Sequence, residues 1–310
     1  MENERFPVPA HASAVFTEIA QGLRVTWHML RSSPIEPNSG SNLARADDLY
    51  PFEKVSVRAR HYVSAALEHL IMWADFAAPL KFHPDQATMF TLQPALALAR
   101  AALESAAQAV WLLDTLDPVE CVRRHLRLIR WDLEEHRKSH LEPDGKDRVK
   151  QRENELVQRV AQVFTERDIR PPQGYLWVIQ QACRPDDLAL DPAPVERLWR
   201  AMSGAAHGMY WTNQELSKIE VNEGPDPNRS RTVLVPDADI MAEALDAAFR
   251  MTQYATLKYL TYAGADIEGL VGGAQRWLAA SITLKPGAAS DTRQRLAALR
   301  LSPDPIRMEE

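Results

Sequence analysis

Apolar residues recur at spacings of three and four along most of this chain, which is the pattern of helices with one buried face. The repeat is clear in residues 11–30, where five apolar side chains share one stripe: Val15, Ile19, Leu23, Trp27 and Leu30. Pro, Gly and Asp interrupt the repeat and divide the rest of the chain into further segments. We expect helices over residues 52–76, 94–113, 117–140, 146–167, 175–183, 194–217, 237–264 and 267–282.

Only one part of the chain has the character of β-structure. Residues 218–221 and 231–235 are rich in β-branched side chains, and turn-forming residues separate them. This arrangement predicts a small β-hairpin. Strands and helices do not alternate elsewhere, so a Rossmann-type or P-loop fold is not expected. The pattern predicts an all-α fold, with a single multi-helix domain that carries one hairpin.

The helices are interrupted near the N-terminus by residues 31–51, which are rich in Ser, Pro, Asn and Gly. We therefore expect three parts. Residues 1–50 are expected to form an N-terminal helix and a mobile loop, and residues 51–284 the helical domain. Residues 285–310 are expected to be a loose C-terminal tail, with at most a short helix around residues 293–299.

Composition narrows the class of protein without identifying it. The 310 residues are 45% apolar and 25% charged, as in an ordinary globular protein, and the net charge of −6 excludes a polycation. Any contact with nucleic acid would need a local basic surface. Cys121 and Cys183 show no CxxC spacing, which predicts two reduced thiols. We find no signal-peptide pattern and no apolar run of ~18 residues, so we expect a cytoplasmic protein without a membrane span.

Polar residues interrupt the apolar pattern of two predicted helices. Arg200 and His207 are seven residues apart in the segment 194–217, so a continuous helix would place both on one stripe. Ser203 lies between them, and small residues there allow close approach by a ligand or another helix. In the Ala- and Leu-rich segment 94–113, Arg100 and Glu104 are four residues apart. They form either an internal ion pair or part of a cavity shared with His207.

Other polar motifs are weaker. Arg123, Arg127 and Arg130 share a face of the segment 117–140, and nearby acidic residues at i,i+4 favour a solvated face over a nucleic-acid stripe. His136 and His140 have a spacing that can hold zinc, but no third ligand is apparent. We find no GxGxxG, GxxxxGK[ST], HExxH or GxSxG motif, so we expect neither a metal nor a cofactor.

The six residues between Arg200 and His207 match the R-x(4–6)-H signature, and the chain thereby resembles HEPN-type helical domains. The earlier Arg100-x3-Glu104, together with Trp111-Leu-Leu and Ser203-Gly-x-x-His-Gly, is similar to a family of hypothetical actinobacterial proteins related to that group. The resemblance covers residues 53–263 by helix order. It implies an up-and-down helical bundle core with extra helices.

The resemblance also implies a chemistry, namely cleavage of RNA without a metal. His207 would act as a general base on a ribose 2′-hydroxyl or as a general acid, and Arg200 would stabilise charge on the phosphoryl oxygens. Arg100, Glu104 and Ser203 would line the binding site. Such sites form at a homodimer interface, and toxins or defence effectors of this group act beside an antitoxin-type protein partner.

A different class of function is open on the same residues. His207 could be a core histidine that is hydrogen-bonded to Glu104 or to a backbone carbonyl. The protein would then be a non-catalytic helical interaction protein or a small-ligand-binding protein, and Arg100, Glu104 and His207 would form a buried polar network. RNA cleavage by the purified chain, and the melting temperature of a His207→Ala variant, distinguish the two.

Overall fold

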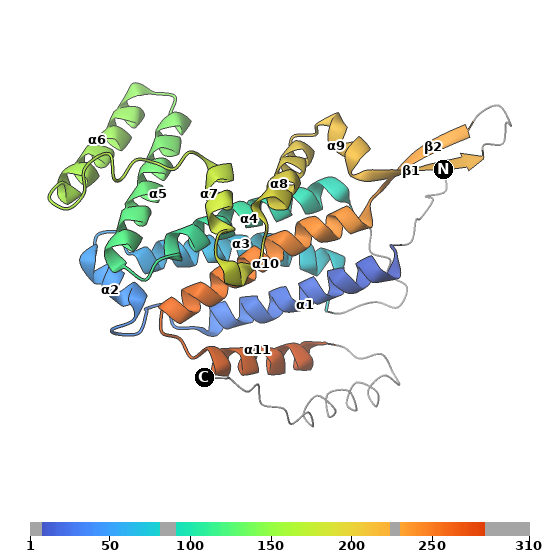
Figure 1. Cartoon of the computed structure of the whole chain (residues 1–310), viewed down its shortest axis with the longest axis horizontal. Coiled ribbons are helices and arrows are strands. Elements are labelled where there is room, and N and C mark those ends of the chain that lie inside the picture. The colour runs from blue at the N-terminus through green and yellow to red at the C-terminus, as the bar shows by residue number, and fades with distance from the viewer. Residues whose placement is uncertain (1–7, 81–90, 224–229, 283–310) are drawn as a thin grey trace.

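The computed structural model describes residues 8–80, 91–223 and 230–282. The predicted tail, its short helix and the tip of the hairpin lie outside these residues. Figure 1 shows the arrangement of the described elements. These elements are α1 (Ala10–Ser32), α2 (Asn42–Leu49), α3 (Val55–Ala77), α4 (Leu92–Leu113), α5 (Pro118–Ser139), α6 (Pro143–Val160), α7 (Tyr175–Ala182), the 3₁₀ turn η1 (Asp186–Leu188), α8 (Pro192–Ala206), α9 (Tyr210–Glu215), β1 (Ser217–Glu223), β2 (Ser230–Pro236), α10 (Ala238–Tyr262) and α11 (Ile267–Ser281).

Helix α4 lies at the centre of the bundle, packed against α3, α7, α8 and α10. It is also a helix whose length and apolar composition would suffice to cross a membrane, and 67% of that apolar window is buried in the fold. Its many Ala residues let neighbouring backbones approach closely, and its Leu side chains fill the spaces between them. The predicted central helix is confirmed, and its apolar surface is used for helix packing.

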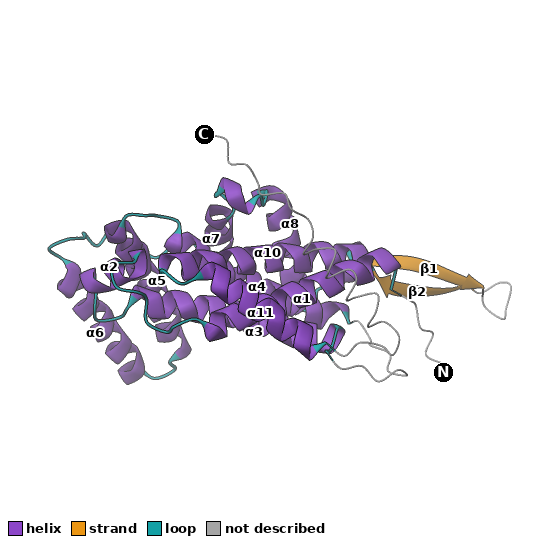
Figure 2. Ribbon diagram, turned by 90° about the horizontal axis from the view of Figure 1, so that it is seen from below, coloured by secondary structure: helices purple, strands orange, loops and turns teal. Residues whose placement is uncertain are grey.

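The N-terminal helix belongs to the same hydrophobic core. Phe16, Ile19 and Leu23 of α1 are buried in one cluster with side chains of the later helices. Helix α1 packs on α3, α10 and α11, and α11 covers its outer side (Figure 1). Figure 2 shows the pair α5 and α6 at one end of the molecule and the hairpin at the other.

Local signals explain where several elements begin. Asp117 accepts a hydrogen bond from Val119 N, and Asp237 accepts one from Asp239 N, so each caps a helix at the predicted start. The predicted hairpin is also confirmed, because β1 and β2 pair antiparallel with Ser217 opposite Pro236. The all-α fold with one small hairpin is therefore correct.

Three predicted segments differ from the structure. The helix expected over residues 146–167 ends at Val160, and Thr165 donates to the Asp168 carboxylate in the turn that follows. Residues 31–51, expected to be a loop, contain α2, whose first turn is capped by the Ser41 hydroxyl accepting from Ala44 N. Leu43 and Ala46 are buried, so contacts with the rest of the fold stabilise a helix that its short sequence pattern did not indicate. The helix expected over residues 194–217 ends at Ala206, and a separate short helix, α9, follows.

Candidate functional site

The end of α8 determines where His207 lies. His207 occupies the C-cap of α8, and Gly208 follows it with a φ of +65°. Met209 N donates to Gly204 O at 2.9 Å and Gly208 N donates to Ala205 O at 3.1 Å. This pair of hydrogen bonds is the Schellman motif, which uses a left-handed residue to end a helix. His207 is therefore exposed at a corner and does not belong to a continuous helical stripe.

Gly204 fixes this corner by letting α9 fold back onto α8. A Cβ atom at Gly204 would lie 2.6 Å from Thr212 Cγ2 and 2.8 Å from Trp211 Cζ2. Thr212 is buried, and its hydroxyl donates to Met209 O at 2.6 Å. Close packing of α9 against Gly204 thus holds the turn that presents His207.

A polar cluster forms where α4 meets α8, and its centre is Glu104. Glu104 Oε1 accepts hydrogen bonds from Arg100 Nε and from Trp199 Nε1, both at 2.8 Å. The Arg100 guanidinium also lies over the Trp199 ring, 5.6 Å from its centroid. The side chains of Arg100 and Glu104 are 21% and 14% exposed, so the pair lies at the boundary between core and solvent.

His207 joins this cluster from the α8–α9 corner. Its Nε2 atom lies 3.5 Å from Nη1 of Arg100. Arginine has no acceptor, so this contact is a hydrogen bond only when Nε2 of His207 carries no proton. Arg100 and His207 thus meet, but His207 is exposed, so the alternative of a core histidine hydrogen-bonded to Glu104 was wrong. We call Arg100, Glu104, Trp199 and His207 the α4–α8 cluster.

Arg200 lies outside the α4–α8 cluster. Its Nε and Nη2 atoms donate to Glu196 Oε1 at 2.9 and 2.7 Å, and its side chain is 59% exposed. The hydrogen bonds from Arg200 and Gln180 hold the pKa of Glu196 below its ordinary value. The expected shared stripe of Arg200 and His207 was wrong, because α8 ends before His207. Ser203 contacts His207 through its backbone, because the Ser203 carbonyl accepts a hydrogen bond from His207 N at 3.2 Å.

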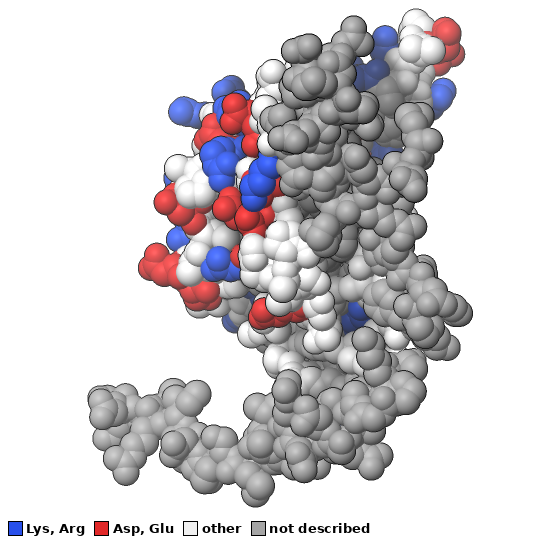
Figure 3. Space-filling model, turned by 90° about the vertical axis from the view of Figure 1, so that its right-hand side faces the viewer, with Lys and Arg blue, Asp and Glu red and all other residues white. Residues whose placement is uncertain are grey.

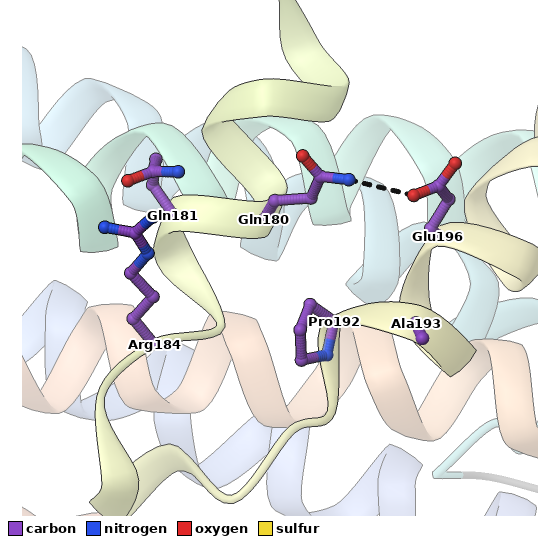
Figure 4. Close-up of a pocket in the computed structure, with 6 residues that line it drawn as sticks. All are labelled: Gln180, Gln181, Arg184, Pro192, Ala193 and Glu196. Atoms are coloured by element: carbon purple, nitrogen blue, oxygen red, sulfur yellow. Dashed lines mark hydrogen bonds between the residues drawn. The ribbon is translucent and has the colours of Figure 1, made fainter.

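A hollow lined by Glu196, the partner of Arg200, lies between α7 and the start of α8 and has a volume of about 320 Å³. Its lining, drawn in Figure 4, consists of Gln180, Gln181, Arg184, Pro192, Ala193 and Glu196. The Gln180 amide donates to Glu196 at 2.8 Å across this hollow. None of the cluster residues lines it, so this hollow and the α4–α8 cluster are separate features.

Trp199 and Tyr175 were not predicted to lie near this cluster. Trp199 immediately precedes Arg200, and an indole N–H inside an amphipathic helix was the available signal that a buried acceptor had to be nearby. Tyr175, at the start of α7, has its pKa raised by burial and by the carboxylate of Glu104. Its ring packs against Trp131 with centroids 4.6 Å apart.

The arginines of α5 do not form a free basic stripe. Arg130 is buried and donates to Glu153 at 2.8 Å, so the predicted solvated face was wrong at this position. Arg127 lies over the rings of Trp111 and Trp177, 5.1 and 5.4 Å from their centroids. Its Nε atom donates to Arg170 O at 2.8 Å. These side chains join helices together, which leaves them poorly placed to bind phosphates.

Charges of both signs lie on the part of the hairpin end that the structure describes (Figure 3). On the coloured part of this face, Lys and Arg alternate with Asp and Glu (Figure 3).

The rings of His136 and His140 lie 4.9 Å apart. Within residues 8–80, 91–223 and 230–282, no group of three or more His, Cys, Asp and Glu side chains could hold a metal ion.

Comparisons with known proteins add no relative to this picture. No family model, no curated protein and no solved structure matches the chain. Among the described residues, the α4–α8 cluster is the arrangement of side chains best suited to acid–base and phosphate chemistry.

Proposed function

We propose that the protein cleaves RNA without a metal, as its resemblance to HEPN-type domains implies, with Arg100 and His207 as the reacting pair. The observation that supports this proposal is the 3.5 Å approach of Arg100 Nη1 to Nε2 of the exposed His207. Arg100 replaces Arg200 in the role of the cation, because Arg100 lies beside His207, whereas Arg200 pairs with Glu196.

The proposed reaction uses each member of the cluster once. Unprotonated Nε2 of His207 takes the proton from a ribose 2′-hydroxyl. The 2′-oxygen then bonds to the adjacent phosphorus, the bond from phosphorus to the 5′-oxygen breaks, and the leaving oxygen takes a proton from water. Arg100 stabilises the charge that develops on the non-bridging oxygens. Glu104 and Trp199 position Arg100. Glu104 accepts from Nε, and Nη1 lies 3.5 Å from Nε2 of His207, so the guanidinium stands beside the general base.

Single-residue variants test the choice of arginine. We expect the purified protein to degrade single-stranded RNA in the presence of EDTA. His207→Ala and Arg100→Gln should each lower the rate by about 100-fold or more, the scale of general base and electrostatic effects. Arg200→Gln is the matched control, and its rate should stay within about twofold of the wild type.

Three results would argue against the proposal. They are intact RNA after incubation with the wild type at high concentration, equal rates for all variants, and loss of activity in Arg200→Gln alone. The third result would instead favour the pair Arg200 and His207 of the sequence analysis. Circular dichroism of each variant shows whether a lost rate reflects a lost fold.

The resemblance also implies a homodimer, and one feature supports this part of the proposal. Met209, Tyr210 and Trp211 come after His207 and Gly208 in the chain, and all three are exposed apolar side chains. A second copy seated on them would bring another His207 close to the first, and an antitoxin-type partner seated there would cover His207. Light scattering after gel filtration tests this, with Tyr210→Glu expected to yield a monomer. A wild type that is monomeric at high concentration would rule the homodimer out.

A second candidate function is a non-catalytic interaction or small-ligand-binding protein. The observation that favours it is the pairing of Glu104, whose Oε1 atom already accepts from two donors. A network satisfied in this way stabilises the contact between α4 and α8 without any substrate. Under this alternative the wild type leaves RNA intact, while substitutions at Glu104 lower the melting temperature.

A further inference from the structure

A second pocket lies between α1, α3 and α11, and none of the residues of the α4–α8 cluster lines it. Its volume is about 490 Å³, within the range of pockets that hold small molecules. Helix α11 lies along α1 at this place (Figure 1). The side chains that matter for its chemistry are Arg24, Trp27, His28 and Arg31 of α1, Asp75 of α3 and Trp277 of α11.

Arg24 is the buried cation of this pocket, and its guanidinium is incompletely bonded. Its side chain is 5% exposed. Nη2 donates to Ala74 O at 3.1 Å and to Asp75 Oδ1 at 2.9 Å. Nε is buried and has no hydrogen-bond partner among the described residues. A buried charged donor without an acceptor is unfavourable, so an acceptor supplied by a ligand would improve the surroundings of Arg24.

Asp75 shows that Arg24 pairs with a carboxylate. Its carboxylate comes from α3, and the side chain is 64% exposed, so it neutralises Arg24 only from the solvent side. The pocket also contains Arg31, which lies over the Trp27 ring with its guanidinium carbon 5.7 Å from the centroid. Two arginines and one carboxylate leave this pocket with a positive charge, which attracts an anion.

Aromatic rings form the apolar part of the same pocket. The rings of His28 and Trp277 are stacked, with centroids 4.8 Å apart and an angle of 30° between their planes. Trp277 is exposed although it is large and apolar, and Trp27 contributes a second indole. Flat rings favour other flat rings, through offset stacking or edge contacts.

We propose that this pocket binds a small aromatic carboxylate. The carboxylate of the ligand accepts a hydrogen bond from Nε of Arg24, the donor that has no partner among the described residues, and the charge of Arg31 adds attraction. The ring of the ligand packs against Trp27 and Trp277. This site uses none of the residues proposed to cleave RNA, so it is a separate binding function.

Isothermal titration calorimetry of the full chain with indole-3-acetate tests the proposal. Indole and acetate, each half of this probe, are the matched ligand controls. We expect indole-3-acetate to bind at least tenfold more tightly than either half. Equal affinity for indole and indole-3-acetate, or no heat from any of the three, would overturn the proposal.

Variants at the rim keep the test independent of folding. Arg31→Gln and Trp277→Ala should each raise the dissociation constant of indole-3-acetate about tenfold, and Arg276→Gln, on the same helix as Trp277 but outside the pocket lining, should leave it unchanged. Asp75→Asn removes the competing carboxylate while keeping an acceptor for Arg24, so the dissociation constant should fall severalfold. A weaker complex in Asp75→Asn, or unchanged binding in both rim variants, would refute the assignment.

Discussion

Replacing Glu104 with Ala tests how much the α4–α8 cluster stabilises the packing of α8 on α4. The substitution removes the atom that accepts from both Arg100 Nε and Trp199 Nε1 at 2.8 Å. Trp199 then loses its acceptor, and a hydrogen bond to a charged group contributes about 1.5–3 kcal/mol. Arg100 loses its counter-ion, but its side chain is 21% exposed, so water restores part of its solvation.

These contributions give an expected loss of about 2–3 kcal/mol in the free energy of unfolding. For a protein of 310 residues the loss corresponds to a fall in melting temperature of roughly 3–5 °C. Thermal unfolding followed by circular dichroism measures the shift, and urea unfolding measures the free energy. Glu104→Gln keeps an acceptor of similar shape, so its effect should be smaller, about 1 kcal/mol.

Glu196→Ala is the control for this prediction. Glu196 also pairs with an arginine four residues along its helix, but its partner Arg200 is mostly exposed. Pairs of this kind add little stability, so the melting temperature of Glu196→Ala should match that of the wild type. A Glu104→Ala variant as stable as the wild type, or equal losses in the two variants, would show that the cluster does not hold α4 to α8.

Three further predictions concern single buried positions. Gly204→Ala should destabilise the protein by about 1–3 kcal/mol in urea unfolding, because the added Cβ would overlap α9. Gly273→Ala is the control, since a Cβ there meets nothing within 4 Å, and it should cause no loss of stability. Equal effects of the two substitutions would contradict this prediction. Burial lowers the pKa of His125 to about 3, so the unfolded chain takes up a proton first as the pH falls below ~6.5. The free energy of unfolding should therefore decline between about pH 6.5 and pH 3, by at most about 1.4 kcal/mol per pH unit. His125→Gln keeps a donor for Glu53 O, and urea unfolding at several pH values should show a flatter decline for this variant. Burial raises the pKa of Cys121 to about 12, so iodoacetamide at pH 8 should label Cys121 only after the protein unfolds. Rapid labelling of Cys121 in the folded protein, detected by mass spectrometry, would contradict this prediction.

The periodicity of the sequence was sufficient to predict most of the helices. Segments such as α1 and α10 have a continuous apolar stripe, and Asp117 and Asp237 mark helix starts through bonds to backbone groups two residues away. These signals are readable because capping and amphipathic patterning involve residues within one or two turns. The pairing of Arg100 with Glu104 was one of the two predicted readings for the same reason, since i,i+4 side chains meet on any helix.

Helix α2 and the end of α8 were less readable, because their stability depends on packing. Eight residues make too short a helix to be stable in isolation, so α2 depends on burial of Leu43 and Ala46. The Gly208 that ends α8 was visible in the sequence, but a single Gly also occurs inside helices. The close approach of α9 to Gly204 is a tertiary contact, and it accompanies the turn at His207.

The sequence by itself determined the helical class, the hairpin and the polar residues that interrupt apolar faces. Only the tertiary structure decided which of those polar residues meet. Arg100 and His207 are 107 positions apart, and they approach because α8 packs on α4. Arg200 is closer to His207 in sequence, yet it turns to Glu196. The physical reason is that local patterns set which face of a helix is buried, whereas helix packing sets which side chains from two faces come into contact.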